Sequence, residues 1–187
     1  YKLYQKKWQN VVKEINNIIS KKNINMLLTA IDAQKFPFYL AKGKNKNEHP
    51  QVPFLYHQIL KRPEDKISTD LVWNTPYAQL FLSIFQDFCK KVKIKKTQLY
   101  RACLNLTFAV ETKQCKPHRD HEYPYRQVII YLNNADPEAK TIILNKNNKI
   151  TNQISPKKNK GVMFDSSFHY HIFPKFGYRI VLIYTFK

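Results

Sequence analysis

Cysteine is scarce in this 187-residue chain, and so are glycine and acidic residues. Three cysteines, with no CxxC pair among them, leave a disulfide framework or a zinc ribbon without support, so we expect a reducing compartment. No apolar run approaches the roughly 18 residues that a membrane-spanning helix needs. We therefore predict a cytoplasmic protein with no membrane partner. The sequence opens on Tyr1 rather than Met, a pattern typical of a chain whose first segment has been trimmed.

The residues that are abundant permit a folded core and a polyanionic partner. Hydrophobic residues make up 43% of the chain and aromatic residues 14%, which excludes wholesale disorder. Lys and Arg number 32 against 13 Asp and Glu, and the net charge of +19 would suit nucleic acid. However, abundant Lys, Asn, Ile, Tyr and Phe with only 3 Gly is the bias of an AT-rich coding sequence. The basic excess is also spread over both halves, so charge alone favours nucleic-acid binding only weakly.

The first half of the chain is typical of helices and loops. Apolar residues between Tyr4 and Ile19 have helical spacing and predict an amphipathic helix. Residues 41–53 are rich in helix breakers and predict a loop, and the longer stretch 41–70 is a candidate for substrate contacts or a lid. Thr75 followed by Pro76 predicts the start of a second helix, which ends in the lysine-rich run 90–96. Lysines there suit the negative end of a helix dipole.

From Leu99 onward the sequence is typical of β-structure. Short runs rich in β-branched and aromatic residues are separated by Asn, Pro, Asp and Lys clusters, as in an antiparallel sandwich or barrel. We predict strands at 99–110, 127–132, 141–144, 161–164, 168–173 and 178–186, and no helix after Thr97. The chain is thus expected to form a single domain, 1–187. Residues 1–98 would supply helical support and loops, and residues 99–187 the β core.

Polar residues at strand ends in this β region indicate a metal site. In His118-Arg119-Asp120 the imidazole and the carboxylate project from the same side of an extended chain. A second cluster, His169-Tyr170-His171, begins another predicted strand, and Arg179 opens the last one. Two His and one carboxylate on one face of an octahedral ion leave positions open, an arrangement suited to non-haem Fe(II) oxygenases. An Arg on a neighbouring strand can hold a distal carboxylate through its two-donor fork.

With these motifs the sequence resembles the Fe(II)/2-oxoglutarate-dependent dioxygenases, and most of all the prolyl-hydroxylase branch with its small phage and bacterial relatives. The resemblance covers Leu99 to Lys187 and is carried by PHRD at 117–120, IIYLN at 129–133, SPKKNKGVMFDSSFHYH at 155–171 and FGYRIVLIYTF at 176–186. It implies an α+β, mainly β fold: a double-stranded β-helix (jelly-roll, cupin-like) core with supporting N-terminal helices. Together with the AT-rich bias, it is also compatible with a viral origin.

The resemblance assigns a role to each site residue. It implies that His118 and Asp120 are iron ligands and that a distal His is the third. It also implies that Arg179 forms a salt bridge with the C5 carboxylate of 2-oxoglutarate, and that Tyr131 donates a hydrogen bond to the same carboxylate. Alternation allows either His169 or His171 as the distal ligand, and we select His169 from its spacing to Arg179. Phe108 stands where related hydroxylases often have a Tyr that reaches the cosubstrate, and Phe cannot donate that bond. Asn105 and Thr107 are candidates to replace it.

Three further residues near the motif have less specific interpretations. Cys115 is interpreted as structural, because the triad needs no thiolate. His121 follows Asp120 and would face away from it, so we interpret it as a surface or substrate-side residue. Tyr125 would either line the pocket mouth or pack on the core.

The resemblance implies a hydroxylase that uses Fe(II), 2-oxoglutarate and O₂, with succinate and CO₂ as co-products and ascorbate as a reductant. A protein or peptide side chain, such as proline, is the favoured substrate. An oxidative nucleic-acid demethylase uses the same iron site on a base removed from the stack, and the charge would suit it. The sequence is also compatible with a non-catalytic basic jelly-roll binding module, and with a cupin-like metal enzyme that does not use 2-oxoglutarate.

Overall fold

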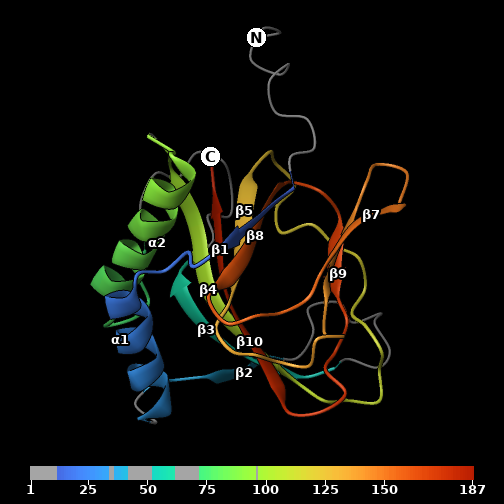
Figure 1. The fold of residues 1–187 in the computed structure, drawn as a ribbon, viewed down its shortest axis with the longest axis horizontal. Coiled ribbons are helices and arrows are strands. Elements are labelled where there is room, and N and C mark those ends of the chain that lie inside the picture. The colour runs from blue at the N-terminus through green and yellow to red at the C-terminus, as the bar shows by residue number, and fades with distance from the viewer. Residues whose placement is uncertain (1–11, 34–35, 42–51, 62–71, 96) are drawn as a thin grey trace, which may run out of the picture.

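The computed structural model of the chain describes residues 12–33, 36–41, 52–61, 72–95 and 97–187 (Figure 1). Its helices are α1 (Lys21–Asp32) and α2 (Ala78–Val92). Its strands are β1 (Lys13–Asn16), β2 (Tyr39–Ala41), β3 (Phe54–Leu60), β4 (Leu99–Phe108), β5 (Arg126–Tyr131), β6 (Thr141–Leu144), β7 (Ile150–Ile154), β8 (Lys160–Asp165), β9 (His169–His171) and β10 (Tyr178–Phe186). Within these ranges, neither helix has the length and apolar character needed to cross a bilayer.

The strands form two antiparallel sheets that enclose an interior between them. The larger sheet has the order β1-β8-β5-β10-β4-β3-β2, and the smaller has the order β7-β6-β9. Both helices cover the outer face of the larger sheet, and the smaller sheet lies on its other side (Figure 1). We call the side of the larger sheet that faces the smaller one its interior face. The predicted mainly β architecture with helical support is confirmed.

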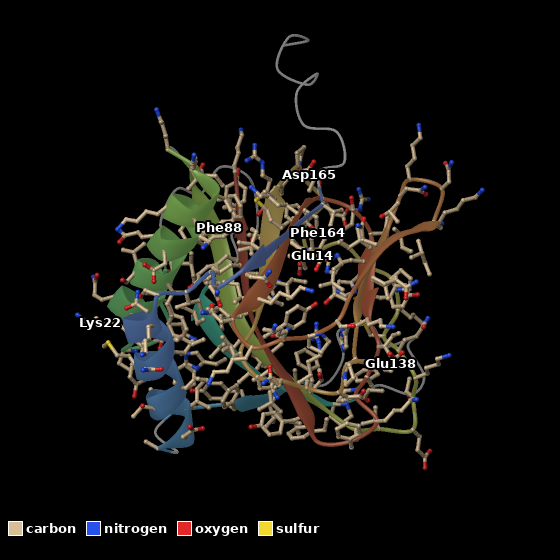
Figure 2. The ribbon with its side chains drawn as sticks, viewed as in Figure 1. Glu14, Lys22, Phe88, Glu138, Phe164 and Asp165 are labelled. Carbon is tan, nitrogen blue, oxygen red and sulfur yellow. The ribbon has the colours of Figure 1, made fainter. Side chains whose placement is uncertain are left out.

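The central strands are buried on both faces, so their alternate residues belong to two different cores. Along β10, one set packs under the helices: Ile180, Leu182, Tyr184 and Phe186. The intervening Val181 and Ile183 pack between the sheets. Phe88 of α2 and Phe164 of β8 lie on opposite sides of the large sheet (Figure 2). The interior face is therefore supplied by every second residue of β4, β5 and β10.

Helix α2 attaches the helical layer to the sheet through aromatic side chains. Its apolar stripe of Phe81, Ile84, Phe85 and Phe88 is buried. The ring of Phe85 lies 5.1 Å from that of Tyr184, whose hydroxyl donates to the carbonyl of Phe81 at 2.7 Å. The helix ends as predicted in lysines, with Lys93 in the left-handed conformation as its C-cap.

The start of α2 lies later than predicted. The helix begins at Ala78, and the hydroxyl of Thr75 accepts a hydrogen bond from the Tyr77 backbone at 3.3 Å. Thr75 thus caps the turn before the helix rather than the helix itself.

The predicted N-terminal helix is wrong over the part that the structure describes. Residues 13–16 form β1, an edge strand paired with β8, while residues 1–11 lie outside the described ranges. The chain then turns at Asn17, which has a φ of 52°. Helix α1 begins only after Ser20, whose hydroxyl accepts from the backbone of Asn23. The strand and the turn together bury the isoleucines between residues 15 and 19. The spacing of these buried residues in the sequence is the same as on one face of a helix, which is why a helix was predicted.

Besides β1, three strands lie where none was predicted. Strand β3 pairs with β4 inside the large sheet, so residues 54–60 of the candidate lid form part of the scaffold. The rest of the candidate loop and lid falls mostly at 42–51 and 62–71, outside the described residues. Strand β7 forms a hairpin with β6, and β2 is only three residues long. From Leu99 to Phe186 the other predicted strands are confirmed within a few residues, and no helix follows Thr97 in the described part.

Gly161 allows β8 to pack closely against its neighbours, and its replacement tests this packing. A Cβ at this position would lie 2.5 Å from Ile18 Cδ1 and 2.9 Å from the carbonyl oxygen of Ile129. We expect Gly161→Ala to lower the free energy of unfolding by about 1–3 kcal/mol, because the added methyl overpacks the site. Urea denaturation measures this. Gln153→Ala on exposed β7 is the control, with an expected change below about 0.5 kcal/mol. Equal midpoints for the two variants would contradict the close packing.

Candidate active site

The interior face of the large sheet has polar side chains at both ends and apolar ones between them. Arg101, Thr185 and Gln127 form one row across β4, β10 and β5. Six residues earlier on β10, about 20 Å along the strand, Arg179 pairs with Thr107. Between these ends lie Cys103, Ile129, Val181 and Ile183. The interior thus has polar groups at both ends of an apolar wall. The side chain of Arg179 shortens the distance between them, because its guanidinium contacts Thr141 of β6, two residues from Ile143, which pairs with His169.

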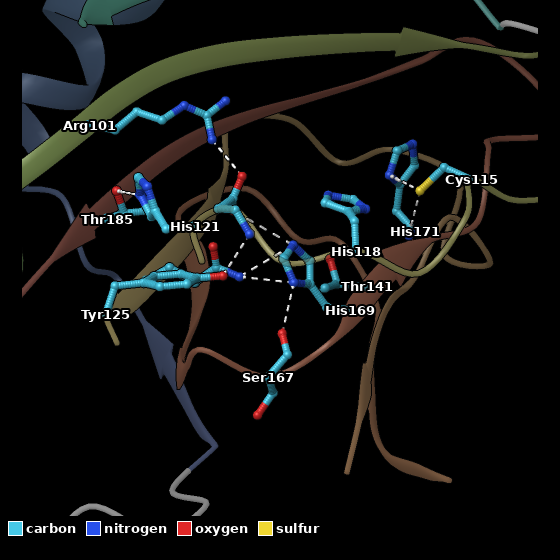
Figure 3. A network of polar contacts seen from close by, with 12 residues as sticks. Arg101, Cys115, His118, His121, Tyr125, Thr141, Ser167, His169, His171 and Thr185 are labelled. Atoms are coloured by element: carbon cyan, nitrogen blue, oxygen red, sulfur yellow. Dashed lines mark hydrogen bonds and ion pairs between the residues drawn. The ribbon is translucent and has the colours of Figure 1, made fainter. Parts of the chain in front are cut away.

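At the first of these ends His118 and His169 lie side by side (Figure 3), and Asp120 lies beside His169. The backbones of His118 and His169 exchange two hydrogen bonds, at 2.9 and 3.0 Å, so the two segments lie side by side. Their rings are 4.6 Å apart between centroids. Asp120 Oδ2 lies 3.8 Å from His169 Nε2. Two imidazoles and one carboxylate from segments about 50 residues apart therefore converge.

Both imidazoles direct Nδ1 at a backbone carbonyl. His118 Nδ1 lies 3.0 Å from the carbonyl oxygen of Lys116, and His169 Nδ1 lies 3.2 Å from that of Ser167. Because a carbonyl only accepts, each Nδ1 carries a proton, and Nε2 is the nitrogen of each ring that a metal can bind once that nitrogen is unprotonated. Metal-binding histidines have this arrangement.

Burial and neighbouring charges separate the pKa values of the two rings. Burial, together with the charge of His118, lowers the pKa of His169 to about 4. His118 is exposed as a residue, although the protein atoms packed around its ring displace water and lower its pKa. Hydrogen bonds with Cys115 and the Lys116 carbonyl and the charge of Asp120 outweigh this and raise the pKa to about 9. His169 is consequently neutral near pH 7, the form in which imidazole binds metals.

Three residues that support this cluster were not assigned to it from the sequence. Arg101 donates to Asp120 Oδ1 at 2.6 Å, and the Tyr125 hydroxyl accepts from the Asp120 backbone at 2.7 Å. The Gln127 amide nitrogen lies 3.3 Å from each ring nitrogen of His169. Tyr125 is buried, which matches the second of its two predicted positions, packing on the core. Arg101 and Gln127 carry no motif, because their contacts depend on which strands become neighbours.

His171 lies in a different environment from His169. Its Nδ1 is 3.1 Å from Cys115 Sγ, and its backbone nitrogen donates to the same sulfur at 3.3 Å. Burial raises the pKa of Cys115, but the charge of His171 and hydrogen bonds from His118 and His171 lower it to about 5. Cys115 is thus paired with His171, whereas His169 faces Asp120.

Arg179 and Tyr131 lie at the second polar end. Arg179 is 3% exposed, and its Nη2 donates to the Thr141 hydroxyl at 2.9 Å. Its Nε is buried without a hydrogen-bond partner, and no carboxylate of the described residues forms an ion pair with it. The Tyr131 hydroxyl lies 2.7 Å from Thr141 Oγ1, and its ring lies 5.3 Å from the guanidinium carbon. Burial lowers the pKa of Arg179.

The residues at the first end fit a metal ion, and those at the second end fit a carboxylate ligand, as the sequence motifs indicate. Within the described ranges, no three His, Cys, Asp or Glu side chains already stand at metal-ligand spacing, and Gln127 lies against the ring of His169. The donor set of two Nε2 atoms and one carboxylate nevertheless suits a ferrous ion. At the other end, a buried guanidinium with an unpartnered N–H suits an organic carboxylate.

Phe108 and His121 differ from their predicted surroundings. Phe108 is 42% exposed and alternates with Thr107, so it lies on the face of β4 opposite to Arg179. Thr107 is the buried neighbour of Arg179, and its hydroxyl donates to the Arg179 carbonyl at 3.4 Å. His121 is not a surface residue. It is buried beside the rings of Tyr123 and Tyr125, and its Nε2 lies 2.7 Å from Thr185 Oγ1.

Comparisons with known proteins find the fold and not a sequence family. No protein-family model matches the sequence, and no curated protein matches it. A 2OG-Fe(II) oxygenase family oxidoreductase from Burkholderia pseudomallei superposes with a TM-score of 0.71 at 13% identity, over 95% of this chain and 84% of that one. The chain therefore has the double-stranded β-helix fold of the 2OG-Fe(II) oxygenases.

Two prolyl hydroxylases share this fold. A prolyl-4-hydroxylase from Pseudomonas putida gives a TM-score of 0.60 at 10% identity, over 96% of this chain and 94% of that one. A prolyl hydroxylase from Trichoplax adhaerens, solved with a hypoxia inducible factor peptide fragment, gives 0.63 at 13% identity, over 94% and 83%. The predicted resemblance to this group of structures is confirmed.

The Thr141 hydroxyl links Arg179 to Tyr131, so its removal should destabilise the protein. We expect Thr141→Val to lower the free energy of unfolding by about 1–3 kcal/mol, because a buried guanidinium N–H loses its acceptor. Thr107→Val is the matched control, since its buried hydroxyl makes only one long hydrogen bond. Chemical denaturation of both variants measures the difference. A loss that is equal in the two variants would argue against the polar link through Thr141.

Proposed function

We propose that this protein is an Fe(II)- and 2-oxoglutarate-dependent dioxygenase that hydroxylates a C–H bond of a protein or peptide side chain. The observation that carries the proposal is Arg179. A fully buried cation without a carboxylate partner is unfavourable unless a ligand supplies one. Here that cation lies at the far end of an interior whose other end holds two imidazoles and a carboxylate. A non-catalytic binding module has no use for this combination.

His118, Asp120 and His169 would hold the metal, and Arg179 with Tyr131 would hold the distal carboxylate of 2-oxoglutarate. With all groups bound, the chemistry supplied is the coupled conversion of 2-oxoglutarate, O₂ and substrate C–H into succinate, CO₂ and substrate C–OH. The Arg179 fork would fix the cosubstrate by two parallel hydrogen bonds. The Tyr131 hydroxyl is close enough to Arg179 to donate to the same carboxylate.

The apolar wall between the two ends would exclude water from the reacting groups. Ile129, Val181 and Ile183 line this wall from β5 and β10. An interior without water strengthens the hold of the Arg179 guanidinium on an anion and limits unproductive side reactions. The protein's contribution is thus orientation and exclusion, and the bound cofactors carry the oxidation. Ascorbate as a reductant has no counterpart in these contacts and stays a prediction.

A peptide substrate has more support than a nucleic acid. Prolyl hydroxylases are among the structures with this fold, and one of these was solved with a peptide fragment. The charge of +19 is the argument for nucleic acid, but the lysine excess follows the compositional bias of the whole chain. We therefore propose a peptidyl side chain, with proline as the first candidate. A cytoplasmic location and a viral origin stay predictions.

The cofactor site is tested by the visible charge-transfer band that Fe(II) and 2-oxoglutarate form together under anaerobic conditions. We expect the band in the wild type, and its loss in Asp120→Ala and His169→Ala, because each removes a proposed ligand. His171→Ala is the matched control and should keep the band, since this ring pairs with Cys115. Arg179→Ala should need about 100-fold more 2-oxoglutarate, as expected for loss of a buried charge pair. A folded wild type without a band, or a band that depends on His171 instead of His169, would contradict the assignment.

The substrate class is tested by succinate release. We expect proline-containing peptides to stimulate it above the uncoupled rate and the same peptides with Pro→Ala to leave it unchanged. Single-stranded oligonucleotides should not stimulate it. Raising salt from about 50 to about 200 mM separates the classes, because neutralised phosphates release counterions and make affinity fall steeply. Stimulation by oligonucleotides with that salt dependence would replace the peptide by nucleic acid and leave the cofactor site intact.

A further inference from the structure

Asp120 is held on two sides by groups that come from elsewhere in the fold. Its backbone N–H donates to the Tyr125 hydroxyl at 2.7 Å, and its Oδ1 accepts from Arg101 Nη1 at 2.6 Å. Its Oδ2 lies 3.8 Å from His169 Nε2. The two carboxylate oxygens therefore have different neighbours. One meets the Arg101 guanidinium, and the other faces the distal imidazole.

We propose that Arg101 is a positioning residue that commits Asp120 to bind the metal through Oδ2 alone. This inference rests on the proposed function and concerns how the same site is set. The side chains of Arg101 and Asp120 are 18% and 9% exposed, so water competes little for their hydrogen bond. The planar guanidinium fixes the rotation of the carboxylate as well as its charge, which a flexible ammonium does less well.

Arg101 itself is held in place by the sheet. It belongs to the polar row with Thr185 and Gln127 on the interior face of β4, β10 and β5. Two members of this row contact the cluster: Arg101 contacts Asp120, and Gln127 contacts His169. The third, Thr185, contacts His121, which follows Asp120 in the chain. The carboxylate is thereby oriented by the rigid centre of the fold and not by the loop that carries it.

The number of oxygens that Asp120 contributes decides how many metal positions remain. Two imidazoles and one carboxylate oxygen occupy three positions of an octahedral ion and leave three open. A chelating cosubstrate takes two of these, and one remains for O₂. If both carboxylate oxygens bound the metal, that last position would be lost. The Arg101 hydrogen bond to Oδ1 prevents this.

The test counts metal-bound water without turnover. The full chain is loaded with Mn(II) alone, at saturating concentration and without 2-oxoglutarate, and ¹⁷O-water electron paramagnetic resonance reports the bound waters. We expect three waters in the wild type and two in Arg101→Met, because the released carboxylate can bind through both oxygens. Arg101→Lys keeps a cationic donor and should retain three. Lys160→Met is the matched control: it breaks the ion pair with Glu14 at the end of β8 distant from Phe164, and should also retain three.

Each outcome decides between a positioning role and a structural one. Three waters in Arg101→Met overturn the proposal, whatever happens to metal affinity or stability. If Arg101→Met does not fold by circular dichroism, Arg101→Ala takes its place, since it also removes the donor to Oδ1 but places no long apolar side chain beside the carboxylate. The same counts then decide. A folded wild type that binds no Mn(II) contradicts the proposed function itself, which distinguishes that failure from a failure of the Arg101 assignment.

Discussion

Burial of β10 on both faces is the constraint on which the rest of the structure depends. A strand with a two-residue period, placed at the centre of a seven-stranded sheet, must supply two cores at once. Its even-numbered residues from Ile180 to Phe186 pack under the helices, and Val181 and Ile183 pack between the sheets. Arg179 and Thr185 continue the second set at its two ends. Strand β10 therefore sets the spacing between the two polar ends of the interior, and the same strand packs against the helices on its other face.

Residue type and spacing were enough to predict the parts of the fold and site that are local in sequence. The strands after Leu99, with the exception of β7, and the helix ending in lysines each show their period within one short segment. The HxD tripeptide and the distal His cluster were visible because few residues bind metals. The roles of Arg101, Gln127 and Thr141 could not be predicted, because the contacts of a strand residue of these types depend on which strands become its neighbours. Strand β1 was missed because buried isoleucines around a turn imitate helical spacing.

Alternation of side chains along a strand could not decide which of His169 and His171 faces Asp120. Both residues lie on β9 and point to the same side, yet they have different partners. One of them exchanges backbone hydrogen bonds with His118 and lies beside Asp120, and the other is taken up by Cys115. On a strand of only three residues, the two side chains are separated by about 7 Å along the chain. That separation is enough for a single carboxylate to reach only one of them.

The unpartnered N–H of Arg179 has a consequence for how this protein persists in a cell. A buried guanidinium that forms no ion pair with a carboxylate of the described residues is costly to the fold, and any anion that binds there adds its binding free energy to folding. The unfolded fraction, and with it the rate of removal by proteases, then depends on the concentration of that small anion. If 2-oxoglutarate is that anion, as proposed, the folded fraction of the protein would rise with the supply of its own cosubstrate.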